Sequence, residues 1–154
     1  MLILRPLSLE EFPLLVPYGY AFFREYEGHV NGVEFRGDVF LESMELMAQW
    51  YDLTVFGLFT QAGTFVGGLA AYLQPDIFTK DKVARDVFVY IDPAYRGGTN
   101  ALRLITAYQD WAKSHGARYA FMVHLHHGPL AEKFQRVFEA LGYVKMETAY
   151  RLAL

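Results

Sequence analysis

Four side chains in the second half of the chain are candidates for a general base: Asp86, Tyr90, His124 and His126. Asp86 lies in an apolar segment, and burial raises the pKa of a carboxyl group towards neutrality. A carboxylate so tuned can take a proton from an ammonium group, and histidine can do so without a large pKa shift. Asp86 and His124 are therefore the candidate catalytic bases. The alternative is a structural Asp86 that caps a strand end or pairs with a neighbouring basic residue.

The histidines also allow a metal-binding hypothesis. His124, His126 and His127 form an H-x-H-H run, and two imidazoles of an extended segment can face one ion. Zinc requires a third and a fourth ligand, and the chain has neither a cysteine nor an H-E-x-x-H motif to supply them. We therefore expect solvated loop histidines and no metal.

A glycine turn indicates a second kind of chemistry. An apolar segment ends at Asp92-Pro93, the pair Gly97-Gly98 follows Arg96, and an amphipathic helical pattern then begins. The first N–H groups of a helix have no intrahelical partner, and the helix dipole is positive at that end. Such a turn favours phosphate or pyrophosphate. The chain has neither G-x-x-x-x-G-K-[ST] nor G-x-G-x-x-G, which argues against a P-loop and a dinucleotide fingerprint.

This stretch resembles motif A of the GNAT family, the GCN5-related N-acetyltransferases. The family has a strand ending in V-x-P and then [RQ]-x-x-G-x-[GA] at the start of a helix. Ile91-Asp92-Pro93 matches the first part, although Thr99 stands where the family usually has glycine. The resemblance implies that acetyl-CoA binds here, with its pantetheine arm beside Val89, Tyr90 and Ile91 and its pyrophosphate on the segment formed by Arg96, Gly97, Gly98, Thr99, Asn100 and Ala101.

The resemblance also implies a reaction, the transfer of an acetyl group from acetyl-CoA to a primary amine of a small molecule, peptide or protein. The family's usual general acid is a tyrosine of the last helix, but Phe138 occupies that position. Ala131 likewise replaces an asparagine that the family carries seven residues earlier. These two departures favour the alternative, a catalytically silent GNAT-fold module that binds acyl-CoA or a protein partner.

Hydrophobic periodicity predicts the elements that position these residues. Strands are expected at 2–5, 53–60, 64–74, 83–91 and 119–123, with one or two closing strands in 143–154. Ser8 and Glu11 fit a capping box at the start of a first helix, which Pro17 kinks or ends. Further helices are expected at 38–50 with Asp38 as the N-cap, 98–115 and 129–141. Strand alternation places Asp86 on the face of Phe88 and Tyr90.

The order β-α-α-β-β-β-α-β-α-β, possibly with a further β, is that of the GNAT fold. We therefore expect a single α/β domain over residues 1–154, with a central mixed sheet flanked by helices.

Composition limits the remaining classes. The 154 residues are 53% hydrophobic and carry a net charge of −3, which argues against nucleic-acid binding. No signal peptide or membrane span is visible, so a cytoplasmic protein is expected, and a homodimer is left open. An acidic group in the first half could attract an amine, but a solvated face is the favoured interpretation; it comprises Glu25, Glu27, Glu34, Asp38 and Glu42.

Overall fold

The computed structural model describes residues 1–26, 32–126 and 128–154. By its internal contacts the chain divides into two compact parts, residues 1–123 and 124–154. The first part holds the whole sheet and most of the helices, and the second holds one helix. None of the helices in the described residues is both long and apolar enough to cross a membrane.

A five-stranded mixed sheet forms the centre of the first part. Its order is β1 (Ile3–Pro6), β2 (Asp52–Phe59), β3 (Phe65–Pro75), β4 (Lys82–Ile91) and β5 (Tyr119–Phe121). The first four strands are antiparallel, and β5 runs parallel to β4. The mixed α/β architecture expected from the sequence is confirmed.

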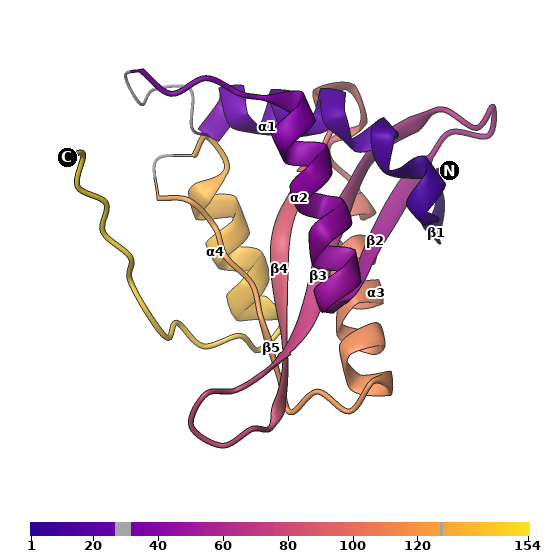
Figure 1. Ribbon diagram of the computed structural model, residues 1–154. Coiled ribbons are helices and arrows are strands. Elements are labelled where there is room, and N and C mark those ends of the chain that lie inside the picture. Colours follow the sequence, from indigo (N-terminus) through magenta and orange to yellow (C-terminus); the bar gives the residue numbers. More distant parts are fainter. Residues whose placement is uncertain (27–31, 127) are drawn as a thin grey trace. The chain divides into compact units, whose positions relative to one another are not determined.

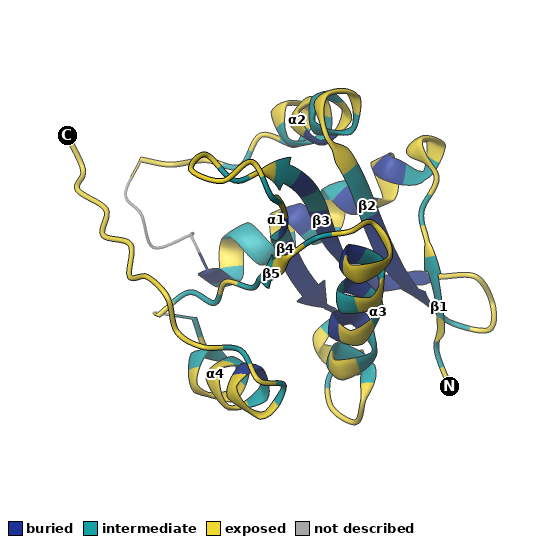
Figure 2. Ribbon diagram, turned by 90° about the horizontal axis from the view of Figure 1, so that it is seen from below, coloured by how far each residue is buried: buried dark blue, intermediate teal, exposed yellow. Residues whose placement is uncertain are grey.

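Helices cover both faces of this sheet. Helices α1 (Val16–Tyr26) and α2 (Gly37–Trp50) lie on one face, and α3 (Asn100–Ser114) lies on the other (Figures 1 and 2). The middle strands between these layers consist largely of buried residues, drawn dark blue in Figure 2. The largest fully buried side chains of the core include Leu15, Met44, Leu69, Leu104 and Tyr108.

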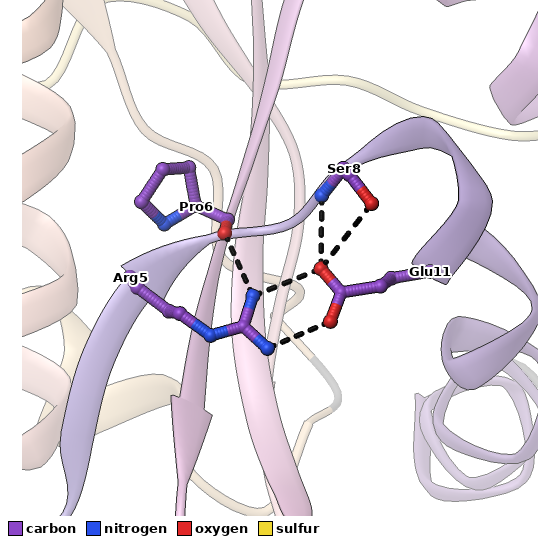
Figure 3. A network of polar contacts seen from close by, with 4 residues as sticks. All are labelled: Arg5, Pro6, Ser8 and Glu11. Atoms are coloured by element: carbon purple, nitrogen blue, oxygen red, sulfur yellow. Dashed lines mark hydrogen bonds and ion pairs between the residues drawn. The ribbon is translucent and has the colours of Figure 1, made fainter.

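The N-terminal strand is tied to the helix that follows it by a polar network (Figure 3). Arg5 donates to both carboxylate oxygens of Glu11, at 2.8 and 2.7 Å, and its guanidinium lies 4.0 Å from the centre of the Phe59 ring. Glu11 reaches back to accept the backbone N–H of Ser8 at 3.0 Å. The predicted start of the helix at Ser8 is therefore confirmed.

The first helical segment differs from the prediction in its course. Residues Leu9–Leu15 form a 3₁₀ helix, η1, which continues directly into α1. Pro17 lies in the first turn of α1 and so begins that helix rather than ending it. This is physically reasonable, because N–H groups in a first turn have no intrahelical acceptor and proline loses nothing there. The N-cap predicted for α2 also differs: Asp38 lies inside the first turn of this helix, and Arg36 is the N-cap.

The second part contains α4 (Ala131–Ala140) and an extended C-terminal segment. The closing strands expected in 143–154 are absent from these residues, and this prediction is wrong. Alternation of apolar and polar residues creates a two-faced segment, but a strand also requires a ladder of hydrogen bonds to a neighbour. Here the apolar members of the alternation, including Val144, Met146, Tyr150 and Leu152, are exposed.

Candidate functional site

The glycine turn connects the end of β4 to the start of α3. A short 3₁₀ segment, η2 (Pro93–Tyr95), follows β4, and the Asp92 carboxylate caps it by accepting the N–H of Ala94 at 2.8 Å. Gly97 and Gly98 then have φ values of 99° and 56°. Both values lie in the left-handed region, which glycine enters without the steric penalty that a Cβ brings. The pair thus turns the chain into the helix.

The turn presents a row of unused donors. Among the described residues, no acceptor binds the backbone N–H groups from Gly97 to Ala101, and the first helical bond runs from Arg103 N–H to the Thr99 carbonyl at 2.8 Å. A Cβ built on either glycine would have no atom within 4 Å, so the turn faces open space. Free N–H groups at the positive end of a helix form an anion site.

The end of β4 is held close to β3 by another glycine. Gly67 has a φ of 151°, and a Cβ there would lie 2.5 Å from the Tyr90 carbonyl oxygen and 2.7 Å from the Ile91 Cα. Asp92 then donates its N–H to the Val66 carbonyl at 2.9 Å. Close approach of the two backbones therefore fixes the point from which the glycine turn starts.

The Arg96 guanidinium, which precedes the turn, forms hydrogen bonds within the fold. Its Nη1 and Nη2 bind the two carboxylate oxygens of Glu25 at 2.8 and 2.5 Å, and its Nε donates to the Ile91 carbonyl at 2.7 Å. The interpretation of Glu25 as part of a solvated acidic face is wrong, because its side chain is only 18% exposed. Sequence offers no signal for this pair, since Glu25 and Arg96 are 71 positions apart.

Strand β4 has a free edge towards the turn. Within the described part of residues 1–123, β5 pairs only with Val83–Arg85 of β4. The segment Val89–Ile91 is buried yet has β3 as its only strand partner. Its other edge has no strand partner in the described part of residues 1–123, although the Ile91 carbonyl there accepts a hydrogen bond from Arg96 Nε at 2.7 Å.

Asp86 lies on the opposite face of the sheet from Phe88, contrary to the prediction from alternation. A β-bulge inserts Val87, so that Asp86 pairs with Ala71 and Phe88 with Ala70. Directly paired residues share a face, and successive residues of a strand do not. The inserted residue shifts the phase of the alternation, so Asp86 leaves the face on which Phe88 contacts the rings of α1 and α2.

The environment of Asp86 favours its neutral form. One carboxylate oxygen accepts the Val123 N–H at 3.3 Å, while the other, Oδ1, is out of solvent and has no partner among the described residues. Burial raises the pKa of Asp86 to about 7. The hydrogen bond from Val123 lowers this pKa, but by less than burial raises it. A carboxyl group with this pKa can both take up and release a proton near neutral pH.

The other candidate bases differ from Asp86. Burial, and next the charge of Glu25, raise the pKa of Tyr90, so its phenol keeps its proton near neutrality. His124 lies in the second part of the chain, where burial and then His126 lower its pKa. Its Nδ1 is buried without a partner among the described residues. His127 lies outside them, and no group of three or more possible metal ligands occurs within them.

Comparison with known proteins identifies the family. A family model described as "Acetyltransferase (GNAT) family" matches residues 18–143, which include the glycine turn, Asp86 and His124. This chain belongs to the GNAT family. Among curated protein sequences, none matches it.

Solved structures of other GNAT proteins share its fold. A Trypanosoma brucei acetyltransferase is 22% identical, with a TM-score of 0.74 and full coverage of both chains. A Brucella melitensis ribosomal-protein-alanine N-acetyltransferase is 17% identical over 100% of this chain and 99% of its own, also at 0.74. The aminoglycoside N-acetyltransferase AAC(6')-Iy, solved in complex with CoA, is 20% identical over 100% and 95%, at 0.73.

The position that usually carries the GNAT general acid is apolar in this chain. Phe138 lies in α4, is 6% exposed, and packs on Phe134 and Tyr143 with ring centres 5.7 and 5.6 Å apart. The helix ends at Ala140 with Leu141 as its C-cap, and Gly142 follows with a φ of 85°. Ala131 is the first residue of the same helix. Neither Phe138 nor Ala131 can donate a proton from its side chain.

Proposed function

We propose that this protein transfers an acetyl group from acetyl-CoA to a primary amine of a small molecule, peptide or protein. The observation that carries the proposal is the row of open N–H donors from Gly97 to Ala101, in a chain of the GNAT family. Free N–H groups at the positive end of a helix dipole suit the negatively charged pyrophosphate of acetyl-CoA. Acetyl-CoA, when bound, supplies the activated acetyl thioester.

The protein's own part in the reaction begins with binding. The N–H groups of the turn hold the pyrophosphate, and the free edge of Val89–Ile91 takes the pantetheine arm. Both placements hold the thioester along β4, the strand that carries Asp86 next to the bulge at Val87. Holding two reactants in register contributes to the rate in its own right.

Asp86 serves as the base in this proposal. As the carboxylate it takes one proton from the incoming ammonium, directly or through a water molecule, and leaves a neutral amine that can attack the thioester carbonyl. His124 is the alternative base. The new nitrogen–carbon bond forms, the carbon–sulfur bond breaks, and the second proton of the nitrogen passes to solvent or to the departing thiolate. The thiolate of CoA leaves without a proton from residue 138, because phenylalanine has none to give.

A catalytically silent acyl-CoA-binding module is the second candidate, and Phe138 is the observation that favours it. The two candidates differ in one assay. Protein, acetyl-CoA and a mixture of primary amines are incubated, free thiol is followed, and products are examined by mass spectrometry. Thiol release that depends on the amine, with one added acetyl group on a product, supports the enzyme. Acetyl-CoA binding without either signal supports the module.

A further inference from the structure

We infer that Glu25 is a positioning residue for the acetyl-CoA turn. Its carboxylate accepts two parallel hydrogen bonds from the Arg96 guanidinium, and we call this pair the Glu25–Arg96 clamp. The inference rests on the proposed function. It assigns a role to a residue of α1 whose carboxylate binds Arg96.

The clamp joins three segments around the turn. Glu25 belongs to the last turn of α1, Arg96 directly precedes Gly97, and Arg96 Nε donates to the carbonyl of Ile91 at the end of β4. The Arg96 guanidinium also lies 5.1 Å from the centre of the Tyr90 ring. One side chain thus fixes the entrance of the turn against α1 and β4.

The turn requires such an anchor because of its sequence. Gly97 and Gly98 adopt left-handed conformations, and no atom of the described residues lies within 4 Å of a Cβ built on either. Glycine has the largest conformational freedom of any residue, so two in succession do not hold a shape by themselves. A bidentate arginine–carboxylate pair supplies both strength and direction. Its members are only 23% and 18% exposed, which limits screening by water.

The clamp also determines which groups of the protein bind the pyrophosphate of acetyl-CoA. Arg96 uses Nη1, Nη2 and Nε within the fold, and the Glu25 carboxylate neutralises its charge. The anion is therefore held by backbone N–H groups, and Arg96 shapes the turn instead of binding the ligand. A direct arginine–phosphate contact makes the opposite prediction for loss of Glu25, since an unpaired Arg96 would then bind the phosphate more tightly.

A matched control exists in the same chain. Arg5 and Glu11 form a second bidentate pair, far along the sequence from the turn and next to β1 and η1 (Figure 3). Glu25→Gln and Glu11→Gln make the same chemical change to the same kind of pair. Calorimetric titration with acetyl-CoA, together with KM and kcat once an acceptor amine is known, compares the two variants with wild type.

We expect Glu25→Gln to weaken acetyl-CoA binding about tenfold, with a matching rise in KM and nearly unchanged kcat at saturation. Glu11→Gln should bind acetyl-CoA as wild type does. If Glu25→Gln fails to fold, Glu25→Asp is compared with Glu11→Asp, and a weaker binding of several-fold is expected only at position 25.

Two results would contradict the positioning role proposed for Glu25. One is tighter binding by Glu25→Gln, which would place Arg96 on the phosphate. The other is equal affinity in the two variants, which would make the pair structural only. Wild type that binds no acetyl-CoA at all would instead overturn the proposed function, so the two failures are distinguishable.

Discussion

At the scale of single residues, the unusual group is a carboxyl without a full set of partners. Asp86 has one oxygen bound to Val123 N–H and one buried oxygen that has no partner among the described residues. A buried, incompletely bonded carboxylate is costly, so such groups favour the protonated form and concentrate at functional sites. Its pKa of about 7 is suited to a base that works near neutral pH.

This environment predicts a pH dependence of the rate. Because only the carboxylate accepts a proton, kcat/KM should rise with pH and level off above about 7, the pKa of Asp86. In Asp86→Asn we expect the rising limb to disappear and the rate to fall about a hundredfold or more. The measurement is kcat/KM from pH 5 to 9 (roughly two units either side of that pKa). A limb that persists in Asp86→Asn and is lost in His124→Ala would assign the base to the histidine.

Phe138 permits a complementary test. If the thiolate leaves unassisted by residue 138, then Phe138→Tyr should change turnover by less than about threefold. Its added hydroxyl enters a buried site and should cost stability by about 1–2 kcal/mol. Acetyl-CoA affinity should stay the same. A gain in kcat of a hundredfold or more would show that a general acid is missing from the natural protein.

At the scale of elements, β4 carries most of the site and glycines shape its end. One bulge, one close backbone approach and one left-handed turn occur at Gly67 and in the segment 86–98. Each departs from regular structure: the bulge and the close approach depend on pairing with β3, and the glycine turn depends on the Glu25–Arg96 clamp. Such departures cluster at functional sites because they aim groups that a regular strand would not.

Gly67→Ala tests the close approach of β3 to β4. Its Cβ would lie 2.5 Å from the Tyr90 carbonyl oxygen, so the strands must separate. We expect a loss of about 2–4 kcal/mol in the free energy of unfolding, together with weaker acetyl-CoA binding. Gly63→Ala is the control, because its φ is 84° but its Cβ would meet nothing within 4 Å. Equal denaturation midpoints for the two variants would contradict the role assigned to Gly67.

At the scale of the whole molecule, Asp86 links stability to pH. Its pKa is about 7 in the folded protein and about 3.9 when unfolded, so the folded state binds more protons between these values. Stability should therefore fall as pH rises from about 4 to about 7, by at most about 4 kcal/mol from this group. Glu11 acts oppositely, since Arg5 above all lowers its pKa to about 2, and its contribution is lost as pH falls below about 4.

Denaturant unfolding of wild type and Asp86→Asn isolates the first effect. The asparagine variant should gain stability relative to wild type as pH rises from about 4 to about 7, because it has no charge to bury. The expected difference is largest above pH 7 (the folded pKa of Asp86). A difference that is flat with pH would show that Asp86 titrates normally in the folded protein.

The sequence predicts the helices and strands that have a local hydrophobic pattern. It misses the features that depend on contacts between distant segments of the chain. Strand and helix periodicity are local signals, and they placed β2 to β4 and α3 closely. The Gly97-Gly98 pair is likewise a local signal for the turn before α3. The bulge at Val87 arises from the way β4 pairs with β3. The Glu25–Arg96 clamp joins residues from distant segments of the chain. Neither has a local signature. The alternation in 143–154 shows the converse, a local signal with no strand partner among the described residues.

The most direct test of the account is the affinity of two variants of the glycine turn for acetyl-CoA. Gly98→Ala brings only the strain of a Cβ at a φ of 56°, whereas Gly98→Asp adds a negative charge beside the N–H groups. We predict by calorimetry that the alanine variant binds within about threefold of wild type, and that the aspartate variant binds at least about thirtyfold more weakly, a difference of about 2 kcal/mol. A folded Gly98→Asp protein that binds acetyl-CoA as tightly as Gly98→Ala would contradict the placement of the pyrophosphate on this turn.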